Sequence, residues 1–174
     1  CYTDHMAFEG THIRFALELQ DELSVKDVNT YLSGTVYPDS RYVTKIDRKL
    51  THDTAFLQKE FYRRSDFNKG WMLHLIYDKV QYDIMTRFLP EVFQDKTSGS
   101  IDEKESWLVR TALKILQDIE DVKTFNTSKT AKLLDITDNP NNEDLEKLSL
   151  YYRVCTQLYV KETLPAISEY IEML

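Results

Sequence analysis

Glycine and proline are scarce in this chain, which has four of each among 174 residues. Turns between β-strands depend heavily on these two residues, so their scarcity argues against a sheet-rich fold and favours long helices. The two cysteines, Cys1 and Cys155, are too few for a disulfide framework. No apolar run approaches the roughly 20 residues that a membrane-spanning helix requires. These absences predict a helical protein that is stabilised by its core.

Positive charge is also in deficit, with 22 Lys and Arg against 29 Asp and Glu and a formal net charge of −7. An acidic balance argues against non-specific binding to nucleic acid or to an anionic membrane, and no nucleic-acid-binding patch is evident. Nothing at the start of the sequence is typical of a signal peptide. We therefore predict a cytoplasmic protein whose native start is Met6. The alternative is a lipoprotein with Cys1 as its mature N-terminus.

Apolar residues recur at the steps of three and four that are typical of amphipathic helices. Their share, 42%, is close to that of globular proteins, and the length suits one domain. We predict an all-α bundle of about six or seven helices. The domain covers residues 1–174, of which residues 1–95 carry the candidate site and residues 101–174 complete the bundle.

Caps and breakers predict where the helices begin and end. The first helix covers Phe8 to Leu23. Ser24 and Asp27 resemble a capping box and start a short helix that ends near Gly34. Residues 35–50 are predicted to be a loop because they lack a period and contain Pro38. Further helices are predicted over residues 51–63, 67–94, 128–136 and 145–171 and between Ser100 and Val122, with loops over residues 96–100 and 138–142.

All four histidines, including His5, lie in the first half of the chain. His74 and Asp78 stand four residues apart in a strongly helical stretch, so their side chains share a face and can reach one ion. The apolar flanks of this stretch predict burial, where an ionised aspartate is costly unless it is paired or ligates a metal. This pair alone favours a buried His–Asp hydrogen bond over a metal site.

Three further side chains, those of His12, Asp39 and His52, are candidate metal ligands when they are considered together. His12 lies on the apolar face of the first predicted helix, where a lone histidine is more often a core residue than a ligand. His52 opens another helix, and Asp39 follows a proline, so a cap and a turn are the simpler interpretations. Together with His74 and Asp78, these residues supply imidazole and carboxylate ligands, which suit zinc and also iron or manganese.

Four segments, in this order, resemble the zinc-dependent phospholipase C family, which also includes single-strand nucleases and many uncharacterised bacterial proteins. They are Thr11-His12-Ile13-Arg14-Phe15-Ala16, Gly34 to Pro38-Asp39, Thr51-His52 and Gly70-Trp71-Met72-Leu73-His74-Leu75-Ile76-Tyr77-Asp78. The resemblance is limited to the N-terminal half of the chain. It implies an all-α bundle, in agreement with the periodicity.

The resemblance also implies roles for five residues. Asp39, His52, His74 and Asp78 would hold one zinc ion, and Asp78 would bridge to a second metal held by His12. A water activated by the ion would attack a phosphate ester, with Asp39 orienting that water or acting as its base. Asp39 is therefore the catalytic candidate, and a small phosphate ester is the expected substrate.

The chain departs from the family pattern after His74. The full enzymes hold a third ion with a later His-x-x-x-Glu pair and another histidine, and no histidine follows His74 here. They also use their mature N-terminal residue as a ligand, a tryptophan in the phospholipases, where this sequence has Cys1. The predicted site is therefore reduced to one or two metals.

Two alternatives stay open at this point. His52-Asp53 is the signature doublet of the HD phosphohydrolases, which are also all-α, with His12 before it and Asp78 or Asp83 after it. This interpretation leaves the Asp39 segment unexplained. The other alternative is a non-catalytic helical protein in which the His and Asp residues hold a structural metal or form a hydrogen-bond network.

Three basic residues, Arg41, Arg48 and Lys49, fall between Asp39 and His52. An arginine there could bind a substrate phosphate, because its guanidinium offers a bidentate fork. For Lys49 a solvated loop position is the preferred interpretation.

Overall fold

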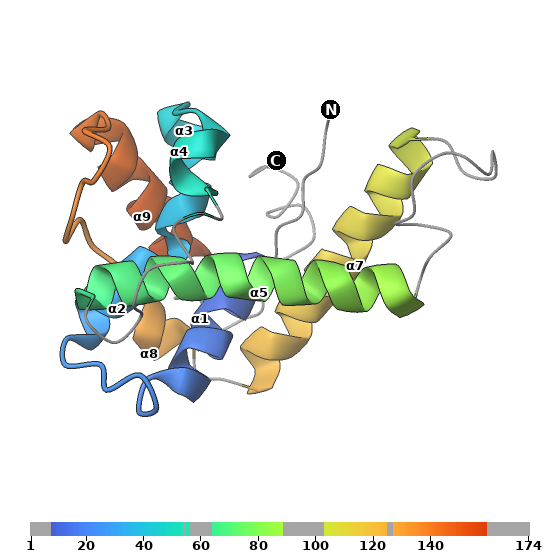
Figure 1. Cartoon of the computed structure of the whole chain (residues 1–174), viewed down its shortest axis with the longest axis horizontal. Coiled ribbons are helices and arrows are strands. Elements are labelled where there is room, and N and C mark those ends of the chain that lie inside the picture. Colours follow the sequence, from blue (N-terminus) through green and yellow to red (C-terminus); the bar gives the residue numbers. More distant parts are fainter. Residues whose placement is uncertain (1–7, 54, 56–63, 89–102, 125–126, 160–174) are drawn as a thin grey trace.

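Helix α5 (Asp66–Phe88) runs along the length of the molecule in the computed structural model (Figure 1). The structure describes residues 8–53, 55, 64–88, 103–124 and 127–159, which contain helices and no strand. The other elements are α1 (Glu9–Leu19), α2 (Val28–Val36), the 3-10 turn η1 (Tyr37–Ser40), α3 (Arg41–Thr44), α4 (Arg48–Thr51), α7 (Glu103–Thr124), α8 (Thr127–Ala131) and α9 (Leu145–Tyr159). The predicted all-α bundle is thus confirmed.

The closest packing in the bundle is between α2 and α5, and two glycines permit it. A Cβ atom on Gly34 would lie 2.0 Å from the carbonyl oxygen of Phe67, and one on Gly70 would lie 2.0 Å from that of Tyr31. Only glycine lets the two backbones meet at this distance. The contact fixes the end of α2 beside the first turns of α5, one turn before His74.

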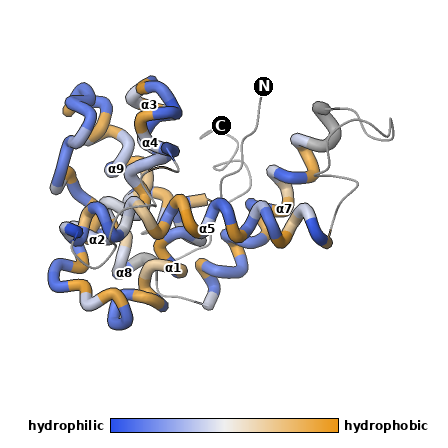
Figure 2. Tube along the Cα trace, viewed as in Figure 1, coloured by the Kyte–Doolittle hydropathy of each residue, from blue (hydrophilic) through white to orange (hydrophobic). Residues whose placement is uncertain are grey.

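The main core lies where α1, α2, α5 and α9 meet. Fully buried aromatic and aliphatic side chains fill it, among them Ile13, Tyr31, Leu32, Tyr37, Phe67, Leu148 and Cys155. Figure 2 shows apolar residues recurring along α5 between hydrophilic ones, as an amphipathic helix requires. Cys155 is a free cysteine and is fully buried.

Helix α1 is held against α7 by buried acidic side chains. Asp118 Oδ1 accepts hydrogen bonds from the backbone N–H of Thr11 at 2.6 Å and from its hydroxyl at 3.1 Å. Asp118 Oδ2 accepts a hydrogen bond from the Tyr159 hydroxyl at 2.8 Å. Arg14 Nη1 donates to Asp121 Oδ1 at 2.8 Å. Because Thr11 lies in the first turn of α1, Asp118 caps this helix from another part of the chain.

The predicted capping box is wrong in its first residue. Ser24 adopts a left-handed conformation in a turn, with φ of 50°. Asp27 is the cap of α2, because its side chain accepts a hydrogen bond from the backbone N–H of Thr30 at 3.2 Å. The helix also continues past Gly34 to Val36, since the contact with α5 keeps this glycine helical.

The prediction of a loop over residues 35–50 is wrong as well. Pro38 lies in the first turn of η1, where its fixed φ suits the start of a helix. The short helices α3 and α4 follow, and His52 ends α4, so the prediction that His52 opens a helix is wrong. Elements of four residues are too short to show an apolar period, which explains why the pattern does not indicate them.

Other predicted limits are too wide or lie beyond the described residues. Helix α1 ends at Leu19, four residues early, and α8 ends at Ala131 rather than at residue 136. After α8 the chain contacts α2, where the backbone N–H of Asp135 donates a hydrogen bond to Ser33 Oγ at 3.1 Å. Helix α5 matches its prediction up to Phe88 and α9 up to Tyr159. Predictions for Cys1, His5, Met6 and residues 54, 56–63, 89–102, 125–126 and 160–174 lie outside the described residues.

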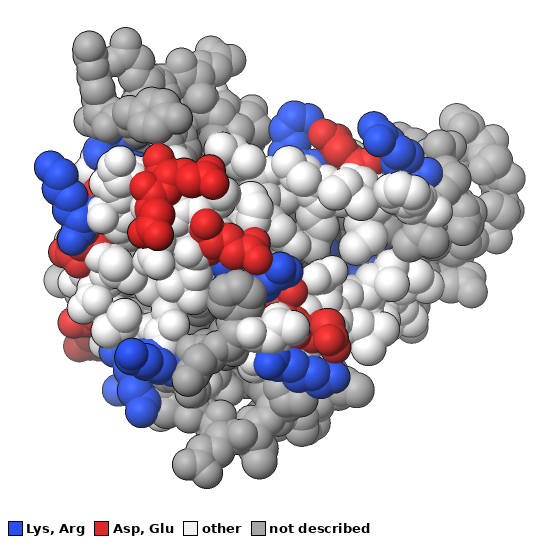
Figure 3. Space-filling view, turned by 90° about the horizontal axis from the view of Figure 1, so that it is seen from below, with Lys and Arg blue, Asp and Glu red and all other residues white. Residues whose placement is uncertain are grey.

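The surface carries charge of both signs. On the face shown in Figure 3, acidic and basic side chains of the described residues are interspersed, and no broad area of a single sign forms there. Among the helices that the structure describes, none combines the length and the apolar character that crossing a membrane would need.

Candidate metal centre

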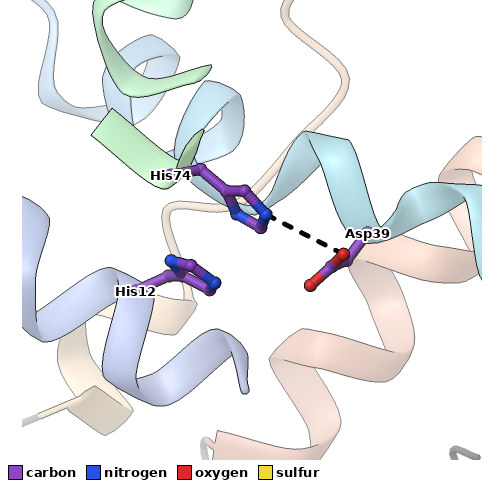
Figure 4. Close-up of side chains that lie close together, drawn as sticks. All are labelled: His12, Asp39 and His74. Atoms are coloured by element: carbon purple, nitrogen blue, oxygen red, sulfur yellow. Dashed lines mark ion pairs between the residues drawn. The ribbon is translucent and has the colours of Figure 1, made fainter. Parts of the chain in front are cut away.

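Five side chains from four parts of the fold converge on one buried point. His12 comes from α1, Asp39 from η1, and His74 and Asp78 from α5, while His52 directly follows α4. Figure 4 shows His12, Asp39 and His74 approaching one another from three separate elements. None of the five side chains is more than 9% exposed. The structure therefore brings together every predicted ligand, and we call this group the His/Asp centre.

The ligand atoms are too far apart for good hydrogen bonds and suitably spaced for a shared ion. The Nε2 atoms of His52 and His74 lie 3.7 and 3.9 Å from Asp39 Oδ1. They lie 3.8 and 3.5 Å from Asp78 Oδ2. Two ligands bound about 2.0–2.1 Å from one tetrahedral ion lie about 3.4 Å apart, whereas N–H···O hydrogen bonds are about 2.7–3.2 Å long. These buried groups could hold a metal ion.

The two carboxylate oxygens of Asp78 face different histidines. Oδ2 faces His52 and His74, whereas Oδ1 lies 3.4 Å from Nε2 of His12. Two sets of ligand atoms each lie within 4.8 Å of one another: His12 with Asp39 and His74, and His52 with His74 and Asp78. The centre thus contains two overlapping ligand sets, with a carboxylate placed between the histidines of both.

Backbone and hydroxyl groups behind the centre orient two of its histidines. His74 Nδ1 lies 2.9 Å from the carbonyl oxygen of Thr35, which can only accept, so Nδ1 carries the proton and Nε2 is left as a ligand atom. His52 Nδ1 lies 2.8 Å from the hydroxyl of Thr51. That threonine is fixed in turn by Trp71, whose Nε1 donates to the Thr51 carbonyl at 2.6 Å.

Several buried atoms that face the centre lack a hydrogen-bond partner among the described residues. They are both ring nitrogens of His12, Oδ1 of Asp39, Nε2 of His52 and Nε2 of His74. Leaving a buried polar atom unsatisfied costs about 1–3 kcal/mol, so proteins rarely leave several together without a purpose. A cation bound here would satisfy Asp39 Oδ1 and one ring nitrogen of each histidine.

Burial keeps the histidines neutral. It lowers the pKa of His12 to about 3, with a further contribution from the charge of Lys114, and that of His74 to about 3, with a contribution from His12. Burial and the charge of His74 also lower the pKa of His52. The rings of His12 and His74 stack with their centroids 3.8 Å apart, which two charged imidazoliums would resist. The neutral ring is the form that binds metals.

Burial has the opposite effect on the carboxyl groups. It raises the pKa of Asp39 well above its usual value, and the charges of Glu9 and Asp78 add to the effect. Burial and the charge of Asp118 raise the pKa of Glu9 to about 7. Without a cation nearby, Asp39 therefore tends to hold its proton, and metal binding would displace that proton.

The two aspartates that the HD alternative adds lie apart from the centre. Asp53 is exposed, and its Oδ1 accepts a hydrogen bond from the backbone N–H of Ala55 at 2.9 Å. Asp83 forms an exposed ion pair with Lys79 at 3.0 Å. Of the predicted doublet, only His52 enters the centre, so the geometry does not favour the HD alternative.

Sequence reasoning did not indicate the residues that surround the ligands. Thr35 and Thr51 act through a backbone carbonyl and a hydroxyl, for which no pattern exists, although Thr51 adjoins a candidate ligand in the sequence. Glu9 lies one turn before His12 and could have been found from that spacing. Lys114 comes from α7, more than a hundred residues after His12, and no local signal links the two.

Comparison with known proteins does not assign the chain to a family. No protein-family model matches the chain, no curated protein matches it, and no solved structure matches it. The resemblance to zinc-dependent phospholipases C therefore stays a prediction, and the function has to be argued from the centre itself.

Proposed function

We propose that this protein is a metal-dependent phosphoesterase whose His/Asp centre binds one or two divalent ions. One observation carries the proposal: five ligand-bearing side chains converge in a buried place where the ligand atoms of three histidines lack hydrogen-bond partners among the described residues. A hydrogen-bonded core network would have its donors and acceptors paired. The resemblance of the N-terminal half points to the same chemistry.

The donor set favours zinc. Three imidazole nitrogens with two carboxylates match the ligands of catalytic zinc sites, and iron or manganese would accept the same set. The position of Asp78 between His12 and the other two histidines supports a second ion. The two ligand sets share His74, whose Nε2 atom can bind only one ion, so a second ion would be held by His12 together with Asp39 or Asp78.

Such an ion, once bound, makes a water molecule more acidic and neutralises charge on a phosphoryl group. The residues of the chain supply the rest. Asp39 Oδ1 faces His52 and His74, where it can orient the attacking water or accept its proton. The backbone and hydroxyl partners of His74 and His52 hold the ligand atoms in place, which preorganises the centre for the reaction.

A structural metal is the second candidate. The observation that favours it is burial, since His12 and His74 are 0% exposed and Asp78, the most exposed of the ligands, reaches only 9%. Structural ions are closed off by their ligands, whereas catalytic ions keep a position open to substrate. An activity measurement on the metal-loaded protein separates the two.

The test compares Asp78→Asn with Asp83→Asn. Both change an aspartate on α5, but only Asp78 belongs to the centre, while Asp83 is exposed. Metal content is measured by elemental analysis, and hydrolysis is measured with p-nitrophenyl phosphate and bis(p-nitrophenyl) phosphate.

We expect wild type and Asp83→Asn to bind stoichiometric metal and to hydrolyse at least one substrate, and Asp78→Asn to lose both properties. A wild-type protein that binds no metal at neutral pH contradicts the proposal. Bound metal without any hydrolysis supports the structural alternative.

A further inference from the structure

Positive charges flank the His/Asp centre on two sides. Lys114 on α7 contributes to the lowered pKa of His12, and Arg48 on α4 contributes to those of His52 and His74. Arg41, which stacks over the Tyr42 ring at 4.1 Å, acts in the same way on His52. Arg41 and Lys114 offset the charge of a carboxylate in the centre, since both act to lower the pKa of Asp39. An anion bound beside the metal would be favoured by the same cations.

Arg48 is placed to meet such an anion. It begins α4, and the backbone N–H of His52 donates to its carbonyl oxygen at 2.8 Å, so Arg48 lies one helical turn before a candidate ligand. Its side chain is half-buried and therefore reachable from solvent. The Nε–H group is buried and has no hydrogen-bond partner among the described residues.

The neighbouring basic residues are engaged differently. Arg41 Nη2 donates to the Tyr42 hydroxyl at 2.6 Å. Lys49, the next residue along α4, is exposed, and its backbone N–H is bonded to Asp47 at 2.9 Å. Among the described carboxylates, none forms an ion pair with Arg48. Arg48 thus lies one helical turn before His52 and forms no ion pair with the described carboxylates.

We propose that Arg48 is the residue that binds the phosphoryl group of the substrate and so sets the specificity of the centre for phosphate esters. This inference rests on the proposed function, because the anion is held between the metal and the guanidinium. Arginine presents a planar fork of N–H donors that matches two oxygens of a phosphoryl group. A carboxylate would be bound less well, since it has fewer oxygens to share between the ion and the guanidinium.

The test measures binding of inorganic phosphate to the zinc-loaded full chain by isothermal titration calorimetry. The variants are Arg48→Gln and Arg48→Lys, with Lys49→Gln as the matched control on the same helix. The zinc content of every sample is measured in parallel, and acetate is titrated as a second anion.

We expect Arg48→Gln to keep its zinc and to bind phosphate at least about tenfold more weakly, as the loss of a charge-assisted hydrogen bond implies. Arg48→Lys should recover part of the affinity, and Lys49→Gln should bind like wild type. With substrate, KM should rise more than kcat falls.

Three outcomes overturn the inference. Equal phosphate affinity of Arg48→Gln and Lys49→Gln in zinc-loaded samples contradicts it while leaving the proposed function intact. Acetate binding as tight as that of phosphate contradicts the specificity. A wild-type chain that takes up no zinc or other divalent metal removes the proposed function, and the inference with it.

Discussion

The molecule contains two polar clusters that each have two buried aspartates and that differ in how well the side-chain atoms are paired. One is the His/Asp centre. The other, between α1 and α7, consists of Thr11, Arg14, Asp118, Asp121 and Tyr159. Asp118 is 0% exposed and Asp39 is 3% exposed, so both carboxyl groups lie away from water. Burial alone therefore does not distinguish them.

Hydrogen bonding does distinguish them. Asp118 accepts hydrogen bonds from Thr11 and Tyr159 through both of its oxygens, and Asp121 is paired with Arg14. In the His/Asp centre, Asp39 Oδ1 and the Nε2 atoms of His52 and His74 have no hydrogen-bond partner among the described residues. The carboxyl groups of the first cluster are paired without any ligand, and the cluster holds two helices together. The second has unpaired ligand atoms that a cation could bind.

Metal removal should produce the largest effect that separates the clusters. A ligand that binds only the folded state adds about 4 kcal/mol to the free energy of unfolding at a thousand times its Kd. We expect a chelator to lower the Tm of wild type strongly and added zinc to restore it. Differential scanning calorimetry checks this. A Tm that chelator and zinc leave unchanged would show that the His/Asp centre, like the α1–α7 cluster, is not stabilised by a bound metal.

Substitution of the two aspartates should give the next largest contrast. Asp118→Ala leaves the buried donors of Thr11 and Tyr159 without an acceptor. We therefore expect the free energy of unfolding to fall by about 3 kcal/mol or more, while metal binding persists. Asp39→Asn in the metal-free protein should change it by less than about 1 kcal/mol, because it removes a carboxyl group whose Oδ1 is unsatisfied. Urea denaturation with chelator present measures both. Similar losses for the two variants would contradict the comparison.

The effect expected to be smallest for a single residue and a single pH unit is a pH dependence of the metal-free protein. His12 and His74 have a pKa of about 3 when folded, against 6.5 in the unfolded chain. The folded state therefore binds fewer protons between these values, and the stability that the neutral rings preserve above pH 6.5 is lost as the pH falls below it. We expect a loss of about 1.4 kcal/mol per pH unit for each histidine.

Urea unfolding between pH 7.5 and pH 5 measures this slope, with His74→Gln as the comparison. The free energy of unfolding of the variant should depend less steeply on pH than that of wild type, because one of the titrating histidines is absent. If both proteins have the same slope, His74 is already exposed to water in the metal-free protein.

The ligands of the centre could be predicted because each carries a local mark. His74 and Asp78 share a helical face at a spacing of four, and Asp39 and His52 stand beside a proline and a threonine in segments that resemble a known family. Their convergence depends on helix packing, which the sequence pattern does not give. The pattern predicted the all-α class because the long helices α5 and α7 repeat their apolar step several times.

The errors have a common physical origin in interactions between distant segments. Ser24 and Asp27 looked like a capping box, but only contacts at the end of the loop decide which one caps α2. The end of α8 depends on the bond between Asp135 and Ser33, about a hundred residues away in the sequence. Arg48 could be named from its place between Asp39 and His52, whereas Lys114 comes from α7, whose position no local pattern predicts.

The glycine contact between α2 and α5 has a consequence for the choice of metal. Gly70 precedes His74 by one turn, and Gly34 precedes Asp39 by five residues, so the backbone contact fixes how far apart these two ligands stand. The size of the ion that fits is then a property of the helix crossing more than of the side chains. A residue larger than glycine at this crossing would push the two helices apart and increase the distance between the ligand atoms of Asp39 and His74. Metal selectivity would then shift from small ions toward larger ones.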